Sequence, residues 1–140
     1  MKKKESAKIP EVVHFGEHLT LDGYGGDLAK LGDRKNVFEV VNELPNLLKM
    51  KKLSTPAVFF APENGEKDPG GWRGFVVVAE SHIAIHTFPA RGFLSADVYT
   101  CRNGLEVQFV VDYFKEKFGL KDVEINLLKR GTKYPVKNIY

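Results

Sequence analysis

The sequence predicts an α+β fold, in which an antiparallel-rich β-sheet has its helices packed on one face as a two-layer sandwich. Two observations lead to this prediction. Short stretches typical of β-strands follow one another directly along the chain, and only two stretches have the apolar spacing of a helix. With 140 residues, 43% of them hydrophobic and 28% charged, the chain is expected to form one soluble domain with its own core.

Two strands are expected in the first half of the chain. Residues 18–22 alternate between polar and apolar side chains and run into the glycine-rich turn 23–26. Residues 56–61 are typical of a buried strand, since apolar side chains follow one another without a break. The Gly-, Pro- and charge-rich stretch 62–72 then predicts a loop long enough to be mobile or functional.

Two helices are expected to cover the sheet. Asn36 can cap a helix over 37–44, with Glu39 at the position of a capping box, and Pro45 is expected to kink or restart it. The apolar stripe within 105–118 predicts the second helix, which a glycine ends.

The remaining strands are expected in quick succession. They cover 74–79, 83–85 and 94–101, with a turn at 89–92. A final half-buried strand is predicted at 123–127, where apolar and polar residues alternate. Such direct connections favour antiparallel pairing.

Charge and composition narrow the possible partners. The net charge is +3 and much of the excess lies in the lysines of 1–4, so no nucleic-acid partner is expected. Residues 1–15 are expected to form a flexible basic lead-in, and residues 16–140 a single domain.

No apolar stretch reaches the ~20 residues of a membrane helix, and 5–8 is not the apolar region of a signal peptide. A cytoplasmic protein without membrane contact is therefore predicted. Cys101 is the only cysteine, which excludes an internal disulfide.

Common catalytic motifs are missing. The four histidines form two pairs, His14 with His18 and His82 with His86. No metal is expected, because neither pair has a Cys or carboxylate cluster beside it in the sequence. Ser81 does not lie in the Gly-x-Ser-x-Gly turn of α/β-hydrolases, and the glycines of 23–26 lack the lysine of a phosphate-binding loop.

The junction Glu80-Ser81-His82 follows the apolar stretch 74–79 directly. A polar group beside a core strand costs a few kcal/mol unless it has partners, so the junction is either a plain turn or a reactive site. In an unbroken strand Ser81 and His86 lie on opposite faces and touch only if the chain bends at Glu80–Ser81. Such a bend would store the backbone strain found at functional sites, whereas without it the histidines would only cap a polar sheet face.

The stretch Glu-Ser-His-Ile-Ala-Ile-His-Thr-Phe-Pro at 80–89, followed by Asp-Val-Tyr-Thr-Cys at 97–101, resembles the bacterial and archaeal S-adenosylmethionine decarboxylase proenzymes. The resemblance runs from about Gly16 to Arg130 and includes Gly-x-His at 16–18 and Lys-Arg-Gly at 129–131. It is specific, because the spacing of three reactive residues is kept without a gap. The fold of that family is a sheet-and-helix sandwich, in agreement with the prediction above.

The resemblance implies self-cleavage between Glu80 and Ser81. The Ser81 hydroxyl would attack the Glu80 carbonyl, and elimination and hydrolysis would leave a covalent pyruvoyl cofactor on the fragment that begins at residue 81. His86 matches the family's proton carrier in this processing. The pyruvoyl carbonyl would form a Schiff base with the substrate's amine and accept the electrons released with carbon dioxide, and Cys101 matches the residue that returns a proton.

The resemblance also implies a substrate and its binding residues. S-adenosylmethionine carries a sulfonium and an adenine, which both suit aromatic faces, so Phe88 is a candidate substrate-binding residue and Phe60 or Phe59 a second. Its decarboxylation would supply aminopropyl groups for polyamine synthesis, including spermidine. Homodimers of cleaved protomers, with sites near the interface, are implied as well.

Among the residues that depart from the family pattern, two leave alternatives open. Ala90 stands where many members have a glutamate expected to bind the ribose, a contact whose loss costs about 1.5–3 kcal/mol. Arg73 stands where the family has a serine beside the processing site. An arginine or ornithine decarboxylase of the same family is therefore one alternative. A non-catalytic paralogue, acting as a binding or regulatory subunit, is the second, although the intact Ser81, His86 and Cys101 argue against it.

Overall fold

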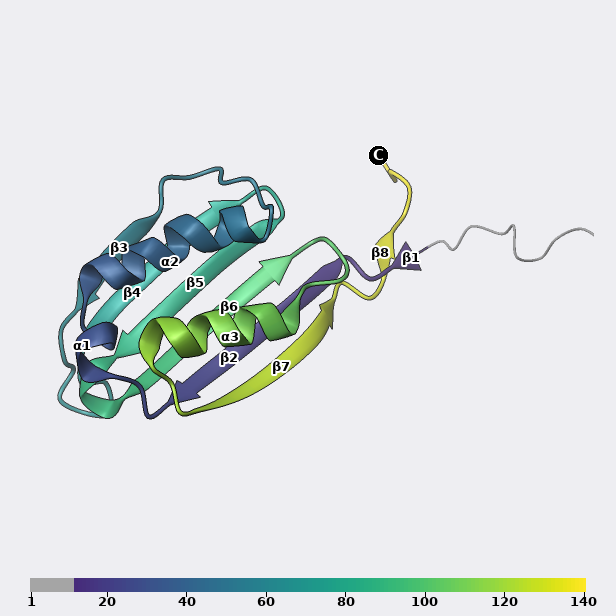
Figure 1. The fold of residues 1–140 in the computed structure, drawn as a ribbon. Helices are drawn as coiled ribbons and strands as arrows, with labels where there is room; N and C mark the ends of the chain where they lie inside the picture. The colour runs from purple at the N-terminus through teal and green to yellow at the C-terminus, as the bar shows by residue number, and fades with distance from the viewer. Residues whose placement is uncertain (1–11) are drawn as a thin grey trace, which may run out of the picture.

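The structure, a computed structural model, describes residues 12–140. Its body is a sheet whose six strands pair in the order β3-β4-β5-β6-β2-β7, with every neighbouring pair antiparallel. Sheet and helices form two layers, which confirms the predicted α+β class (Figure 1). The strands are β2 (Gly16–Tyr24), β3 (Ala57–Ala61), β4 (Gly71–Val78), β5 (Ser81–Phe88), β6 (Phe93–Thr100) and β7 (Asp122–Arg130).

Two long helices cover one face of this sheet (Figure 1). α2 (Arg34–Leu47) packs on β3, β4 and β5, and α3 (Val107–Phe118) packs on β2 and β7. The one-turn helix α1 (Leu28–Leu31), capped by Asp27, was not expected from the sequence. Fully buried side chains fill the space between the layers, and each contributes about 1.5–3 kcal/mol. They include Leu19, Leu21, Val37, Leu44, Ile83, Ile85, Phe114 and Phe118.

α2 begins at Arg34, three residues earlier than the predicted start at 37. The side chain of Asp33 accepts a 3.0 Å hydrogen bond from the Lys35 N–H and so caps the helix, a role predicted for Asn36. Asn36 instead donates its side-chain N–H to the Lys117 carbonyl oxygen in α3 at 2.9 Å. Glu39 is not part of a capping box either, because its carboxylate pairs with the Lys117 ammonium at 2.8 Å. Contacts between the two helices therefore override the local capping pattern.

Pro45 does not restart the helix, since α2 continues through it to Leu47. A proline removes one intrahelical hydrogen bond, and here only half a turn of helix follows it. The helix is closed by a tight bend, in which the Met50 N–H donates to the Pro45 carbonyl oxygen at 2.7 Å and Lys49 has φ 59°.

β3 is an edge strand and not the buried strand predicted at 56–61. Within the described part of the chain it pairs with β4 alone, and Phe59 and Phe60 are 64% and 61% exposed. An unbroken apolar run has no polar positions to mark a solvent-facing side, so its sequence cannot separate an edge strand from a buried one.

The central strands place alternate side chains on the two faces of the sheet. In β5, Ile83 and Ile85 are fully buried under the helices. His82 and His86 lie on the opposite, helix-free face, called the open face below. The helix α3 ends at Gly119, whose φ of 65° makes the left-handed cap predicted there.

A small second sheet pairs β1 (Val12–Val13) with β8 (Tyr134–Pro135) beside the body (Figure 1). The fold therefore includes residues ahead of the predicted boundary at 16, whereas the first eleven residues of the predicted lead-in lie outside the described residues. Among the helices of residues 12–140, none has both the length and the apolar character needed to span a bilayer.

Candidate active site

The turn between β4 and β5 brings together three of the predicted catalytic residues. Ser81 is the first residue of β5 and stands opposite Thr100, the last residue of β6. Cys101 follows Thr100, and its backbone N–H donates a 2.7 Å hydrogen bond to the carbonyl oxygen of Glu80. The Glu80 carboxylate accepts a bond from the Lys51 N–H at 3.2 Å. The carbonyl oxygen and the carboxylate of Glu80 thus each accept a hydrogen bond that holds them in place.

Ser81 has a strained backbone. Its φ of 152° lies in a region that glycine adopts and other residues avoid. Such a conformation costs on the order of 1–3 kcal/mol and persists only where the surroundings enforce it. The pairing of Ser81 with Val78 on one side and Thr100 on the other supplies that constraint. The bend expected at Glu80–Ser81 is therefore present.

His86 of the same chain does not approach Ser81. β5 pairs with β6 without interruption from Ser81 to Phe88. A separation of five residues corresponds to about 16 Å along a strand, and an odd separation puts the two side chains on opposite faces. Although the chain bends at Ser81, the side chains of Ser81 and His86 in one chain do not come into contact.

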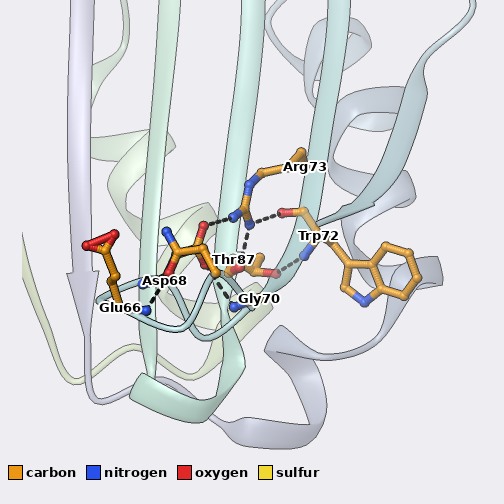
Figure 2. A network of polar contacts seen from close by, with 7 residues as sticks. Glu66, Asp68, Gly70, Trp72, Arg73 and Thr87 are labelled. Atoms are coloured by element: carbon orange, nitrogen blue, oxygen red, sulfur yellow. Dashed lines mark hydrogen bonds and ion pairs between the residues drawn. The ribbon is translucent and has the colours of Figure 1, made fainter. Parts of the chain in front are cut away.

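Arg73 of β4 is held in a network of polar contacts near the other end of β5 (Figure 2). Its guanidinium forms a 2.7 Å ion pair with Asp68 and donates to the carbonyl oxygens of Thr87 at 3.1 Å and Trp72 at 3.3 Å. The guanidinium carbon also lies 4.7 Å from the centre of the Phe88 ring. Arg73 therefore does not extend freely into solvent.

Asp68 ties the loop 62–70 into this network (Figure 2). Its carboxylate accepts a 2.8 Å hydrogen bond from the Gly70 N–H, and this bond, with the Arg73 guanidinium, holds the pKa of Asp68 below its usual range. The Asn64 side chain accepts hydrogen bonds from the backbone N–H groups of Glu66 and Asp68 at 2.9 and 3.2 Å. The loop is thus folded upon itself beside Arg73.

His86 lies on the open face in register with Arg73. Partial desolvation lowers the pKa of His86 below its ordinary value of 6.5, and the charge of Arg73 lowers it further. Asp97 and Asp68 act in the opposite direction without reversing the shift. The neutral imidazole that results near pH 7 is the form that can accept a proton.

The two rings predicted to bind the substrate lie on different faces of the sheet. Phe88 is on the open face, under the Arg73 guanidinium. Phe60 packs edge-on against Trp72 on the helix side, with ring centres 5.2 Å apart. Phe59, the alternative second ring, stands opposite Arg73 and shares the open face with Phe88. The structure therefore does not bring Phe60 and Phe88 together.

Asp97 joins two histidines that the sequence had put into separate pairs. On the open face its Oδ2 lies 2.7 Å from Nε2 of His18 and 2.9 Å from Nε2 of His82. The expectation that no carboxylate lies beside these histidines is wrong, because it considered neighbours in sequence only. Two imidazoles and a carboxylate are a known ligand set for divalent transition metals.

Arg130 opposes the use of this cluster as a metal site. A guanidinium nitrogen of Arg130 lies 2.7 Å from Nδ1 of His18. Because a guanidinium only donates, Nδ1 is the acceptor, and the neutral ring carries its proton on Nε2 and donates it to Asp97. A histidine that binds metal through Nε2 usually has its proton on Nδ1, directed at an acceptor. The cluster is therefore a hydrogen-bonded network.

A pocket of about 420 Å³ opens on the helix side at the Ser81 end of the sheet. It is lined by Thr100, the loop 102–106 and residues 47–50. Its volume is in the range of small-molecule sites. None of the predicted substrate-binding rings (Phe59, Phe60 and Phe88) lines this pocket.

Comparisons with known proteins identify the family. The family model described as S-adenosylmethionine decarboxylase matches residues 17–131, which is most of the chain. The chain belongs to this family. The resemblance seen in the sequence is thereby confirmed.

Relatives of this chain within the S-adenosylmethionine decarboxylase family are archaeal and bacterial. The S-adenosylmethionine decarboxylase proenzyme of Thermococcus gammatolerans is 35% identical, over 88% of this chain and 81% of the relative. The proenzyme of Pyrobaculum arsenaticum is 36% identical, over 81% of this chain and 86% of the relative. The crystal structure of the adenosylmethionine decarboxylase from Aquifex aeolicus matches with a TM-score of 0.74 and 27% identity, and it covers 90% of this chain and 98% of that one.

The sequence did not reveal the contacts between side chains on adjacent strands of the sheet. Asp97 and His18 were not candidate site residues, and neither was Asp68. A signal for the first two was present, since both lie in predicted strands beside polar neighbours. Using it needed the strand order, because β2, β6 and β5 are adjacent in space and distant in sequence.

Proposed function

We propose that this chain is the proenzyme of a pyruvoyl-dependent S-adenosylmethionine decarboxylase that cuts itself between Glu80 and Ser81. The observation that carries the proposal is the linkage itself, which is strained at Ser81 and has its carbonyl bonded to the Cys101 N–H. The names of the Thermococcus and Pyrobaculum relatives support the substrate. The product would supply aminopropyl groups for polyamine synthesis, including spermidine.

Cleavage begins with attack of the Ser81 hydroxyl on the carbonyl carbon of Glu80. A C–O bond forms, the C–N bond breaks, and the hydroxyl proton passes to the released amine, so that the amide becomes an ester. Negative charge develops on the carbonyl oxygen, where the Cys101 N–H already donates. The strain at Ser81 raises the energy of the starting amide and so lowers the barrier.

Elimination then separates the two fragments. A base removes the Cα proton of residue 81, the Cβ–O bond breaks, and Glu80 leaves as a carboxylate. The dehydroalanine that remains takes up water and releases ammonia, which leaves the pyruvoyl group and requires neither an oxidant nor a reductant. This group supplies a carbonyl that can accept the electrons released in decarboxylation.

His86 is the proposed proton carrier for this processing, and it would come from a second copy of the chain. Within one copy about 16 Å of strand separates it from Ser81. A homodimer packed through the open faces would bring His86 of one copy toward the β4–β5 turn of the other, which carries the Glu80–Ser81 peptide. Phe59 and Phe75, 64% and 43% exposed, offer apolar surface for such packing.

Cys101 and the open-face rings have proposed roles in turnover. The half-buried Cys101 adjoins the new N-terminus and would return a proton to the α-carbon of the product. Phe88 would stack on the substrate, with Phe59 as its partner on the same face. Phe60 is less suited to this role, because it contacts Trp72 on the helix side.

A mass spectrum of the purified protein tests the cleavage. Two fragments that meet at Glu80/Ser81 are expected, and the one that begins at residue 81 should be blocked to Edman sequencing, whereas a single stable chain would contradict the proposal. Ser81→Ala is the control and should remain intact and inactive. A cytoplasmic location stays a prediction.

Release of labelled carbon dioxide tests the substrate. S-adenosylmethionine is expected to be the preferred substrate among S-adenosylmethionine, arginine and ornithine. Ala90 and Arg73 favour arginine or ornithine as the second candidate, since neither needs a partner for a ribose. Preference for either would keep the pyruvoyl mechanism and replace the substrate.

A further inference from the structure

Cleavage would leave the reactive end of β5 with fewer restraints than it had in the intact chain. Residue 81 loses its covalent link to Glu80, and it loses its backbone N–H when ammonia is released. His82 then becomes the first residue of the new chain that has a backbone N–H. New chain ends fray unless contacts hold them, whereas a reacting carbonyl must be positioned within a fraction of an ångström. This reasoning rests on the cleavage proposed above.

The side chain of His82 is held by a carboxylate that is itself held. Asp97 accepts from Nε2 of His82 at 2.9 Å and from Nε2 of His18 at 2.7 Å, both through Oδ2. Arg130 donates to Nδ1 of His18 at 2.7 Å and lies over the Tyr99 ring, 4.8 Å from its centre. The network thus links β5, β6, β2 and β7 across the open face.

Aromatic contacts fix the ring planes in this network. The His82 ring stacks on Phe75 at 6.1 Å and meets Tyr99 edge-on at 5.6 Å. The His18 ring stacks on Tyr99 at 4.8 Å. Neither imidazole can turn away from Asp97 without losing such a contact, so the carboxylate is a fixed anchor.

We propose that Asp97 is a positioning residue that holds the chain end created by cleavage, by anchoring His82 one residue from the pyruvoyl carbonyl. In the intact chain the Glu80–Ser81 peptide already restrains this end of β5, because the Glu80 carbonyl oxygen accepts a hydrogen bond from the Cys101 N–H. The anchor matters after cleavage, when that peptide is gone. A residue that only stabilised the fold would matter equally before and after.

The test compares Asp97→Asn in two backgrounds, the self-cleaved protein and the uncleavable Ser81→Ala chain. Asparagine keeps the shape of the side chain, but its amide oxygen carries no charge and accepts hydrogen bonds from the two Nε2–H groups more weakly than the Oδ2 of a carboxylate does. Amide hydrogen exchange of residues 82–86 is expected to rise roughly ten-fold in the cleaved protein and less than about two-fold in the Ser81→Ala chain. The value of kcat should fall roughly ten-fold with KM little changed, since the carbonyl moves while the substrate contacts remain.

The matched control is Asp22→Asn, which removes a half-buried carboxylate from the same face of β2. It should leave exchange and kcat as in the parent. Equal effects of Asp97→Asn in both backgrounds would overturn the anchoring role, and so would unchanged exchange in the cleaved protein. If Asp97→Asn stops cleavage, His18→Ala takes its place under the same criteria, because it removes one donor and leaves the carboxylate. An uncleaved parent protein would instead refute the proposed function itself.

Discussion

The backbone N–H of Cys101 donates to the carbonyl oxygen of Glu80 at 2.7 Å, across the end of two adjacent strands. This places the candidate proton donor of the decarboxylation beside the carbonyl that the Ser81 hydroxyl attacks in the proposed cleavage. Because the contact is made by the backbone, it does not depend on the side chain at position 101. In the proposed mechanism processing and turnover therefore use different groups of one residue, and substitutions can separate them.

Cys101→Ala should cleave itself at nearly the parental rate and then turn over slowly. The backbone N–H remains on the Glu80 carbonyl, whereas the proton donor is lost, which costs roughly 100-fold in turnover or misdirects protonation. Fragment masses against time measure the first step, and carbon dioxide release the second. A Cys101→Ala chain that stayed intact would show that the thiol acts in processing.

Gly16→Ala should slow self-cleavage. A Cβ at Gly16 would overlap the Thr100 carbonyl oxygen and lie 2.8 Å from Cys101 Cα, so the end of β6 must shift and the bond to Glu80 with it. The control is Gly23→Ala on the same strand, whose Cβ meets the side chain of Leu120 and not the backbone. Both variants should lose stability in urea, but only Gly16→Ala should cleave more slowly. Equal cleavage rates would contradict the role of the contact.

Ser81→Gly should be more stable than Ser81→Ala. Both lack the hydroxyl and remain uncleaved, so the comparison isolates the backbone. Glycine tolerates the φ of 152°, while alanine retains a strain on the order of 1–3 kcal/mol. Glycine also has greater entropy in the unfolded chain, so a net gain of about 1 kcal/mol, or roughly 3 °C in Tm, is expected by thermal unfolding. A Tm of Ser81→Gly at or below that of Ser81→Ala would argue against strain at this position.

Local patterns in the sequence were sufficient to predict the layers of the fold and the turn between β4 and β5. Each strand from Gly71 to Thr100 follows the previous one after a short turn, so its partner is its neighbour in sequence. The glycine cap of α3 is equally local. The polar junction after an apolar strand indicated either a plain turn or a strained reactive site, and the φ of 152° at Ser81 shows that strain is present.

The rest depended on contacts between distant segments. Asn36 does not cap α2 as predicted, because its side-chain N–H donates to the Lys117 carbonyl oxygen in α3. Asp97 meets His18 only because β2 inserts between β6 and β7 in the sheet. His86 was matched to Ser81 by the resemblance, which carries no information on whether one chain or two supply the pair.

Ala90→Glu should strengthen the binding of S-adenosylmethionine. Ala90 is exposed in the short helical turn Pro89–Arg91, where a longer side chain meets no packed core. A carboxylate there could accept hydrogen bonds from a ribose, worth about 1.5–3 kcal/mol, so KM should fall at least ten-fold. Ala90→Gln is the control with the same length and no charge. Binding of arginine should not gain, and an unchanged KM for S-adenosylmethionine would place the ribose elsewhere.

Arg73→Ser should move the acid limb of the self-cleavage rate to higher pH. In the folded chain desolvation and the Arg73 charge lower the pKa of His86, so the imidazole stays neutral to a lower pH than in an unfolded chain. As the pH falls below about 6.5, His86 takes up a proton in the unfolded chain while it stays neutral in the folded chain. The folded chain therefore loses stability between about pH 6.5 and the lower pKa that His86 has when folded.

Removal of Arg73 raises the folded pKa, because the repelling charge goes and Asp68 loses its partner. Desolvation remains, so the shift should be partial. Arg73→Lys keeps the charge and is the control, with an acid limb close to that of the parent. NMR titration of the His86 ring in the Ser81→Ala chain measures the pKa directly. A His86 pKa that was the same with arginine, lysine and serine at position 73 would show that this charge does not tune the imidazole.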